Sequence, residues 1–145
     1  MAPPFDLERF VQAQDPVIEQ ARRELEQGRK HSHWMWFVFP QLRGLGRSAT
    51  AHHFAIASLA EAQAFIEHPA LGPRLRECTE LVLRLQERSI GQIFGSPDDM
   101  KFHSCVTLFS MVRDAAPVFH AALVKYFAGE PDRLTIELLA TARRS

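Results

Sequence analysis

Hydrophobic side chains recur at intervals of three and four along most of this chain, which is the spacing of one face of an α-helix. The longest stripe lies on a helix predicted to begin at Pro69 or Pro73, and its members are Leu71, Leu75, Cys78, Val82 and Leu85. A second stripe follows Pro97, and its members are Phe102, Cys105, Val106 and Phe109. Each stripe predicts a helix that buries one face in a shared core.

Residues that favour helix starts and ends divide the rest of the chain. Asp, Ser and Pro suit the first turn of a helix, and glycine suits the position just after its end. Starts are predicted at Asp6, Asp15, Ser48, Ser58, Ser89, Ser96, Pro117 and Asp132, and ends at Gly28 and Gly129. The helices that start at Ser48, Ser58 and Ser96 are expected to reach about Ala57, His68 and Arg113. Strand patterns are weak, so we expect one all-α domain, residues 1–145, of about seven helices.

One segment has no helical or strand period. The run from Trp34 to Phe39 is apolar at every position. Such a run fits a short extended segment and a buried helical turn equally well. In either form it is expected to be a rigid floor beneath the turn that follows Pro40.

Length and composition place the chain among globular proteins with a single core. A chain of 145 residues buries roughly 68–70% of its unfolded surface, so it can fold without disulfides or metals. Its two cysteines have neither a disulfide pattern nor a metal-ligand spacing. The N-terminus lacks a signal-peptide pattern, and the longest apolar run is too short to span a bilayer. These features predict a cytoplasmic protein that does not enter membranes, and they leave its oligomeric state undefined.

Positive charge is concentrated in one window, although the whole chain is neutral. There are 17 Lys and Arg residues and 17 Asp and Glu residues, a balance that argues against a general nucleic-acid binder. From Gln27 to Ala60 there is no acidic residue. The basic and histidine side chains of this window are Arg29, Lys30, His31, His33, Arg43, Arg47, His52 and His53. An aromatic run beside unopposed positive charge predicts a site for a flat, anionic small molecule.

The glycine-rich turn from Pro40 to Ser48, with Gln41 as one of its candidate ligand-binding residues, is the first candidate for that site. Backbone N–H groups at Gly44 and Gly46 can approach a phosphate closely, and Ser48 begins a helix whose N-terminus attracts anions. Two guanidinium groups flank the turn, those of Arg43 and Arg47. The alternative is a tight turn that needs two glycines and carries solvated arginines.

Three further groups of side chains complete the predicted site. Trp34 and Trp36 are candidates to stack on a base, or they belong to the core. Lys101, Ser104 and Thr107 recur at intervals of three and form either a second wall of the anion site or a solvated helix face. His33 and His53 are the candidate acid–base groups, because histidine titrates near neutral pH. No histidine spacing matches a zinc site, so neither a metal nor another cofactor is expected.

A set of ordered motifs resembles a known bacterial family. The motifs are His33-Trp-Met-Trp-Phe-Val-Phe-Pro-Gln41, Gly44-Leu-Gly46, His68-Pro-x-Leu-Gly-x-Arg-Leu75, Ile93-Phe-Gly95 and Thr107-Leu-Phe109. Together they resemble the family catalogued as domain of unknown function 1810, over almost the whole chain from Phe5 to about Leu139. This resemblance implies a small, mainly α-helical, cytoplasmic domain.

A more distant likeness is to the NADAR group, helical proteins linked to NAD and ADP-ribose metabolism, some of which cleave N-glycosidic bonds. It depends on the segment from Ser48 to Phe54 and on Leu71-Gly-x-Arg74. That group typically has Glu where this chain has Ala51. The likeness implies an ADP-ribose-like ligand and, if the domain is an enzyme, hydrolysis of an N-glycosidic bond.

Three hypotheses follow from the sequence. In the first, the domain binds a nucleotide or phosphorylated sugar. In the second, it is a non-catalytic module that docks a protein or nucleic acid through its aromatic and basic window. In the third, the glycines and aromatic residues serve folding only. A concave site on which Arg43 and Lys101 converge would favour the first hypothesis, and a flat face with exposed tryptophans would favour the second.

Overall fold

The computed structural model describes residues 5–144, with side chains described up to residue 141, and this part contains ten helices and no strand. The helices are α1 (Glu8–Gln14), α2 (Ile18–Gln27), α3 (Met35–Val38), α4 (Ala49–His53), α5 (Leu59–Glu67), α6 (Leu71–Arg84), α7 (Ile90–Phe94), α8 (Asp98–Ser110), α9 (Pro117–Phe127) and α10 (Arg133–Arg144). The all-α prediction is confirmed. The number of helices exceeds the expected seven because α3, α4 and α7 are single short turns between the seven longer helices.

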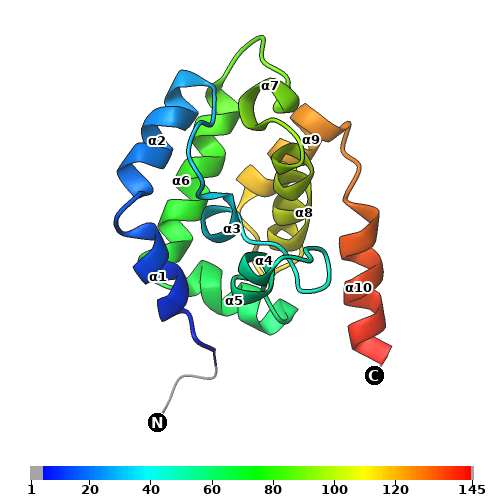
Figure 1. Ribbon diagram of the computed structural model, residues 1–145. Coiled ribbons are helices and arrows are strands. Elements are labelled where there is room, and N and C mark those ends of the chain that lie inside the picture. Colours follow the sequence, from blue (N-terminus) through cyan, green and yellow to red (C-terminus); the bar gives the residue numbers. More distant parts are fainter. Residues whose placement is uncertain (1–4, 145) are drawn as a thin grey trace.

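The long helices α6 and α8 form the centre of the molecule (Figure 1). Helix α2 packs on α6 from one side, α9 packs on both α6 and α8, and α10 lies at the opposite edge against α8. Aromatic rings fill the space between them. Phe39 meets Phe94 and Phe102 edge to face, with ring centroids 5.7 and 5.2 Å apart, a favourable aromatic arrangement. The core therefore lies directly beneath α3.

The apolar run after His33 is helical: of the two conformations that its pattern fits, the structure has the helical turn and not the extended segment. Met35–Val38 forms α3, and the isolated bridge between Leu42 and Ile56 is the extended pairing within the described residues. The run lacks a period because Trp34, Met35, Val38 and Phe39 are all buried, so no face needs to be polar. Its side chains form the floor that the sequence predicts.

Most predicted starts are confirmed, and several ends come earlier than expected. Ser58 and Ser89 cap α5 and α7 with their hydroxyl groups. Helix α4 ends at His53 instead of about Ala57, since the chain leaves it to pair Ile56 with Gln41 and Arg43. Helix α8 ends at Ser110 instead of about Arg113.

Helix α10 is held to α8 by a buried polar network. The Thr107 hydroxyl donates to the carbonyl of His103 (2.8 Å) and accepts the backbone N–H of Asp132 (2.9 Å). Asp132 Oδ2 accepts the hydroxyls of Thr135 (2.6 Å) and Ser104 (3.4 Å). Asp132 thus caps α10, as its sequence position predicts, and ties that helix to its neighbour.

Replacing Thr107 with Val is expected to destabilise the protein by about 1–2 kcal/mol, because the buried N–H of Asp132 loses its acceptor. Amide exchange at Asp132 and Thr135 should accelerate more than exchange in α6. Thr141 makes the same hydroxyl-to-carbonyl bond within α10 but is exposed, so Thr141→Val is the matched control. Equal effects of the two substitutions would contradict this role for Thr107.

Candidate functional site

The loop that leads into the aromatic run is held by one buried carboxylate, that of Glu24 on α2. Glu24 is 1% exposed. Its Oε1 accepts the backbone N–H groups of His31 and Ser32 and the indole N–H of Trp34, at 2.8, 2.9 and 3.0 Å. Its Oε2 accepts the Ser32 hydroxyl (2.6 Å) and the Gln20 amide (2.9 Å). Five donors therefore converge on one side chain.

These bonds decide the protonation state of Glu24. Burial alone would raise the pKa of its carboxyl, but the hydrogen bonds from Ser32, His31 and Gln20 outweigh burial and hold the pKa at about 2. Sequence reasoning missed this residue, since it precedes the acid-free window by three positions. The available signal was a charged residue on the buried face of α2, beside Ala21 and Leu25.

The hydrogen bonds around Glu24 also hold Trp34 in the core. Its side chain is 0% exposed, and its only N–H is donated to Glu24. In this conformation its ring offers no face to a ligand. Trp36, in contrast, is half-buried.

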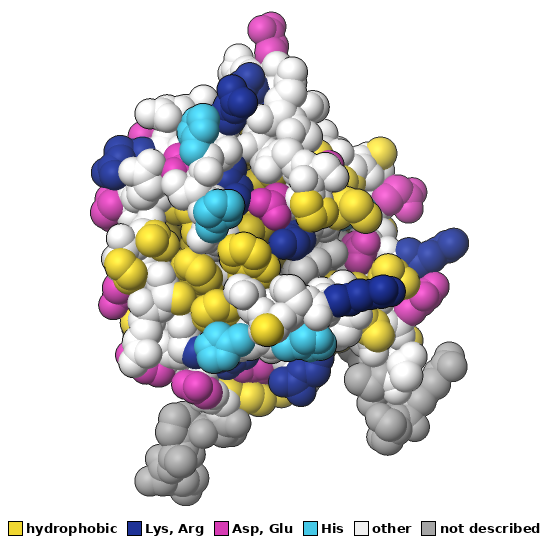
Figure 2. Space-filling view, in the orientation of Figure 1, with side chains coloured by type: hydrophobic (Ala, Val, Ile, Leu, Met, Phe, Trp, Pro, Cys, Tyr) yellow, Lys and Arg dark blue, Asp and Glu magenta, His cyan; other side chains and the backbone are white. Residues whose placement is uncertain are grey.

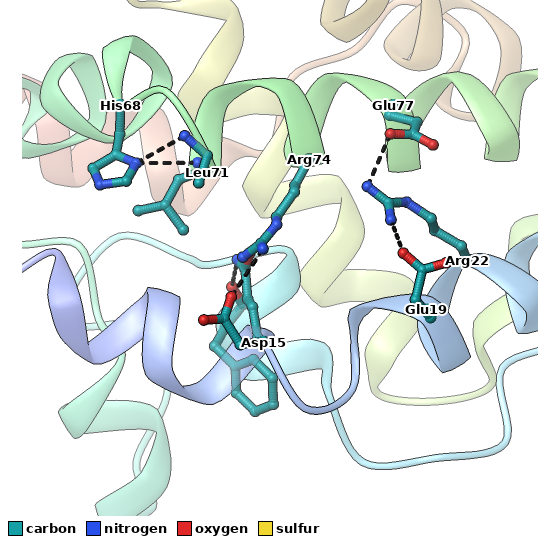
Figure 3. Close-up of polar contacts among 10 residues, drawn as sticks. Asp15, Glu19, Arg22, His68, Leu71, Arg74 and Glu77 are labelled. Carbon is teal, nitrogen blue, oxygen red and sulfur yellow. Dashed lines mark hydrogen bonds and ion pairs between the residues drawn. The ribbon is translucent and has the colours of Figure 1, made fainter.

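A second network positions α3 from the opposite side. The amide of Gln14, a buried residue, donates to the carbonyl of Phe37 (2.6 Å), and Arg74 on α6 donates to Gln14 (3.3 Å) and to Asp15 (2.8 Å). Figure 3 shows Arg74 reaching from α6 toward Asp15, with Arg22 bound between Glu19 and Glu77 farther along the same interface.

The motif that begins at His68 is explained by packing and capping. The ring Nδ1 of His68 accepts the backbone N–H groups of Ala70 and Leu71, at 3.0 and 3.2 Å, and so caps α6 (Figure 3). Gly72 lies so close to α5 that an added Cβ would stand 2.0 Å from the carbonyl oxygen of Ile66. The residues of this motif thus build the frame around the candidate site.

A narrow cleft opens beside Trp36. The cavity within it measures about 10 Å³, which is room for about one water molecule. It brings together five of the predicted site residues: Trp36, Gln41, Gly44, Gly46 and Lys101. Met35, Phe39 and Phe54 are among the apolar residues that complete the lining. Residues from α3, the following turn, α4 and α8 therefore meet at this cleft, but Arg43 does not line it, so Arg43 and Lys101 do not converge as the first hypothesis expects.

Two lysines share one carboxylate at the edge of this cleft. Asp98 lies 2.9 Å from Lys30 Nζ and 3.4 Å from Lys101 Nζ. The side chains of Lys30, Asp98 and Lys101 are 9%, 18% and 20% exposed. Lys101 Nζ also lies 4.9 Å from the ring centroid of Trp36, within the range of a cation–π contact. The cluster carries one positive charge more than its carboxylate neutralises.

The far wall of the cleft is fixed by Arg9 of α1. Its guanidinium donates to the carbonyls of His53 and Ala55, each at 2.8 Å, and to the buried carboxylate of Glu61 at 3.1 Å. Glu61 in turn accepts the N–H of Ala57 (2.6 Å). These bonds hold the chain from α4 to α5 in place while leaving the ring of His53 exposed.

The glycines of the turn serve packing. Gly44 has a φ of +103°, and a Cβ there would touch Leu138 at 3.4 Å. A Cβ on Gly46 would lie 2.4 Å from the Cβ of Ala51. Both positions require glycine without any ligand.

The remaining candidates of the turn and of α8 lie outside the cleft. The Ser48 hydroxyl accepts the N–H of Ala51 (3.0 Å) and caps α4. Arg47 is exposed, and Arg43 lines a separate apolar hollow beside Leu138. Ser104 and Thr107 belong to the α8–α10 interface described above.

The candidate acid–base histidines do not line the cleft either. His33 is exposed, and His53 lines a different surface hollow with Asp6, Glu8 and Arg9.

Within residues 5–141, no three His, Cys, Asp or Glu side chains are placed to hold a metal ion. Burial raises the pKa of Cys78 to about 12 and that of Cys105 well above its ordinary value, so both thiols stay protonated at neutral pH. None of the described helices has the length and apolar character needed to cross a membrane.

Figure 2 shows the face that carries the cleft: hydrophobic side chains gather at its centre, with Lys, Arg and His side chains around them. The fold and this site define a small all-α domain in which a short aromatic helix is clamped between two polar networks. The chain belongs to the family described as Protein of unknown function (DUF1810), which it matches over residues 4–139. The family resemblance predicted from the motifs is thereby confirmed.

A solved structure shares this fold closely. It is the crystal structure of the conserved hypothetical protein Rv1873 from Mycobacterium tuberculosis, which is 57% identical to this chain. The alignment covers 95% of this chain and 99% of the other, with a TM-score of 0.93. No curated protein matches. The likeness to the NADAR group stays a prediction.

Proposed function

We propose that this domain binds a small phosphorylated ligand with a flat ring, of the nucleotide or ADP-ribose type, at the mouth of the cleft beside Trp36, which would have to widen to admit it. The observation that carries the proposal is the surplus positive charge of Lys30 and Lys101 around Asp98. A charge shielded from water is costly unless an opposite charge is near it. A ligand anion would supply that charge.

The distances indicate which lysine would reach the ligand. Lys30 makes the shorter contact to Asp98, at 2.9 Å, whereas Lys101 lies at 3.4 Å and lines the cleft. An entering phosphate would draw Lys101 away from Asp98 and leave the Lys30–Asp98 pair intact. The half-buried ring of Trp36 would then stack on the flat part of the ligand, and the Gln41 amide would bind a polar group on it.

The cleft favours binding over hydrolysis. Cleaving an N-glycosidic bond requires a group that activates water or stabilises the developing positive charge, and carboxylates usually do so. Neither a carboxylate nor a histidine lines the cleft, and Asp98 at its edge is occupied by two lysines. Catalysis is tested separately, by assaying the release of nicotinamide from NAD. We expect no release.

A docking surface is the less favoured function. That hypothesis expects a flat face with exposed tryptophans. Trp34 is fully buried and Trp36 is half-buried beside a cleft. Weak quenching of tryptophan fluorescence by acrylamide is expected in the free protein.

The binding proposal is tested by titration calorimetry with ADP-ribose, NAD and AMP at low salt. Lys101→Gln should raise the Kd of the bound ligand about 10- to 100-fold, which is the loss of a charge-assisted hydrogen bond of about 1.5–3 kcal/mol. Arg113→Gln, which removes an exposed cation at the end of α8, should leave the Kd unchanged.

Two outcomes would overturn the proposal. Absence of heat and of any thermal shift with all three ligands would exclude this ligand class. Loss of binding in Arg47→Gln with retention in Lys101→Gln would place the anion at the glycine-rich turn instead.

A further inference from the structure

A second hollow lies on the other side of Lys30, between the α2–α3 loop and α7. It contains about 740 Å³ of empty space, part of it open to solvent. Arg29, Lys30 and Arg88 line it together with residues 91–95, and its lining includes no acidic side chain. The backbone N–H of Lys30 donates to the carbonyl of Ile93 (2.7 Å) and joins the two walls. Lys and Arg side chains are visible on the upper part of the face in Figure 2.

Arg88 is held in this hollow by packing. It is half-buried, and its Nε lies so close to Gly28 that a Cβ there would be 2.9 Å away. Gly28 also has a φ of +81°, which suits glycine. Among the described side chains, no carboxylate pairs with Arg88 or Arg29, and neither guanidinium has a hydrogen-bond acceptor. The guanidinium groups of half-buried Arg88 and exposed Arg29 thus line one hollow without a carboxylate partner.

Part of the floor of the hollow is glycine backbone, at Gly91 in the short helix α7 and at Gly95 just after it. A Cβ at Gly91 would meet only the Ser89 hydroxyl, at 3.9 Å, so packing does not require glycine there. Glycine within a helix costs about 0.5–1 kcal/mol relative to alanine. The capping box of α7 holds this floor in place, with Ser89 and Gln92 bonded reciprocally at 2.8 and 3.1 Å.

We infer that this hollow, bounded by Arg29, Lys30 and Arg88, is a second anion site that takes a dianionic phosphoryl group of a small molecule. The Lys30 ammonium is already paired with Asp98, so two guanidinium charges remain for the ligand. A phosphoryl dianion would neutralise both guanidinium charges, whereas a carboxylate would neutralise only one of them. The planar donor fork of arginine also suits two phosphate oxygens at once. The site differs from the Trp36 cleft and does not depend on the function proposed for that cleft.

The test uses inorganic pyrophosphate, titrated calorimetrically at low salt and followed by backbone amide shifts. The wild type should bind it, with the largest shifts at residues 28–30 and 88–95. Arg88→Gln and Arg29→Gln should each weaken binding at least 10-fold. Gly91→Asp should abolish it, because the new carboxylate points into the hollow. An Asp in the first turn of α7 is compatible with that helix, and thermal unfolding of each variant checks that the fold is retained.

Lys101→Gln separates this site from the cleft: Lys101 does not line the second hollow, so the pyrophosphate-induced amide shifts at residues 28–30 and 88–95 should persist in this variant. Pyrophosphate binding that is lost in Lys101→Gln and kept in Arg88→Gln would assign the anion to the cleft and overturn this inference, while supporting the proposed function. Absence of binding to the wild type, or equal binding by Arg88→Gln, would also overturn it. A nucleoside diphosphate that binds no better than pyrophosphate would show that the hollow recognises the phosphoryl group alone.

Discussion

Glu24→Ala is expected to lower the free energy of unfolding by about 3–5 kcal/mol. The substitution leaves the buried indole N–H of Trp34 and the N–H groups of His31 and Ser32 without their acceptor. Each buried donor without a partner costs about 1–3 kcal/mol, and partial hydration of the loop reduces the sum. Urea unfolding followed by circular dichroism measures the loss. Glu26→Gln, an exposed residue of the same helix, is the control and should change stability by less than about 0.5 kcal/mol.

The pKa of the Glu24 carboxyl predicts how the free energy of unfolding varies with pH. Its pKa is about 2 in the folded protein and 4.5 in its ordinary state. Because the folded pKa is the lower one, the stabilisation is present above about pH 4.5 and is lost as the pH falls toward 2. The shift corresponds to about 3 kcal/mol.

The isosteric variant Glu24→Gln isolates this contribution. It should be less stable than the wild type at pH 7 and should lose less stability between pH 5 and pH 3. A wild type and a Glu24→Gln variant with the same stability at both pH values would contradict the role assigned to the charge.

Gly72→Ala is expected to have an effect of similar size, a loss of about 3 kcal/mol or more. The added Cβ would stand 2.0 Å from the backbone oxygen of Ile66 and 2.9 Å from its carbonyl carbon. Backbone atoms cannot turn aside as a flexible side chain can, so α5 and α6 would have to separate. Overpacking of this kind costs about 1–3 kcal/mol or more, and the helices that separate also carry the buried Phe65 and Leu75.

Gly91→Ala is the matched control for that substitution. It adds the same atom to a helical glycine, but into open space, so it should stabilise the protein slightly, by up to about 1 kcal/mol. Thermal and urea unfolding of the two variants make the comparison. A Gly72→Ala variant as stable as Gly91→Ala would show that α5 and α6 do not approach as closely as described.

The glycine-rich turn shows why the sequence misplaced part of the site. Gly44 and Gly46 have the residue type of a phosphate cradle, but the same glycines are needed where a turn packs against Leu138 and Ala51. A single sequence cannot distinguish these causes, because both require the absence of a Cβ. Lys101, predicted as part of a second wall opposite the glycine-rich turn, lines the same cleft as Gly44 and Gly46. The carboxylate that it contacts, Asp98, is shared with a lysine 68 positions away, a contact that no local pattern indicates.

The sequence by itself determined the class of fold and most helix boundaries of this protein. Period and capping are local properties, so stripes such as the one from Leu71 to Val82 and caps such as Ser58, Ser89 and Asp132 can be recognised without knowing the neighbours. The conformation of the aromatic run could not be predicted from the sequence, because a segment buried on every side has no polar face to set its period. Tertiary structure also decided the site: it buried Trp34 against Glu24, left Trp36 and Lys101 at a cleft, and gathered Arg29 and Arg88 around α7. Those outcomes depend on contacts between distant segments, and such contacts leave no fixed spacing in a chain.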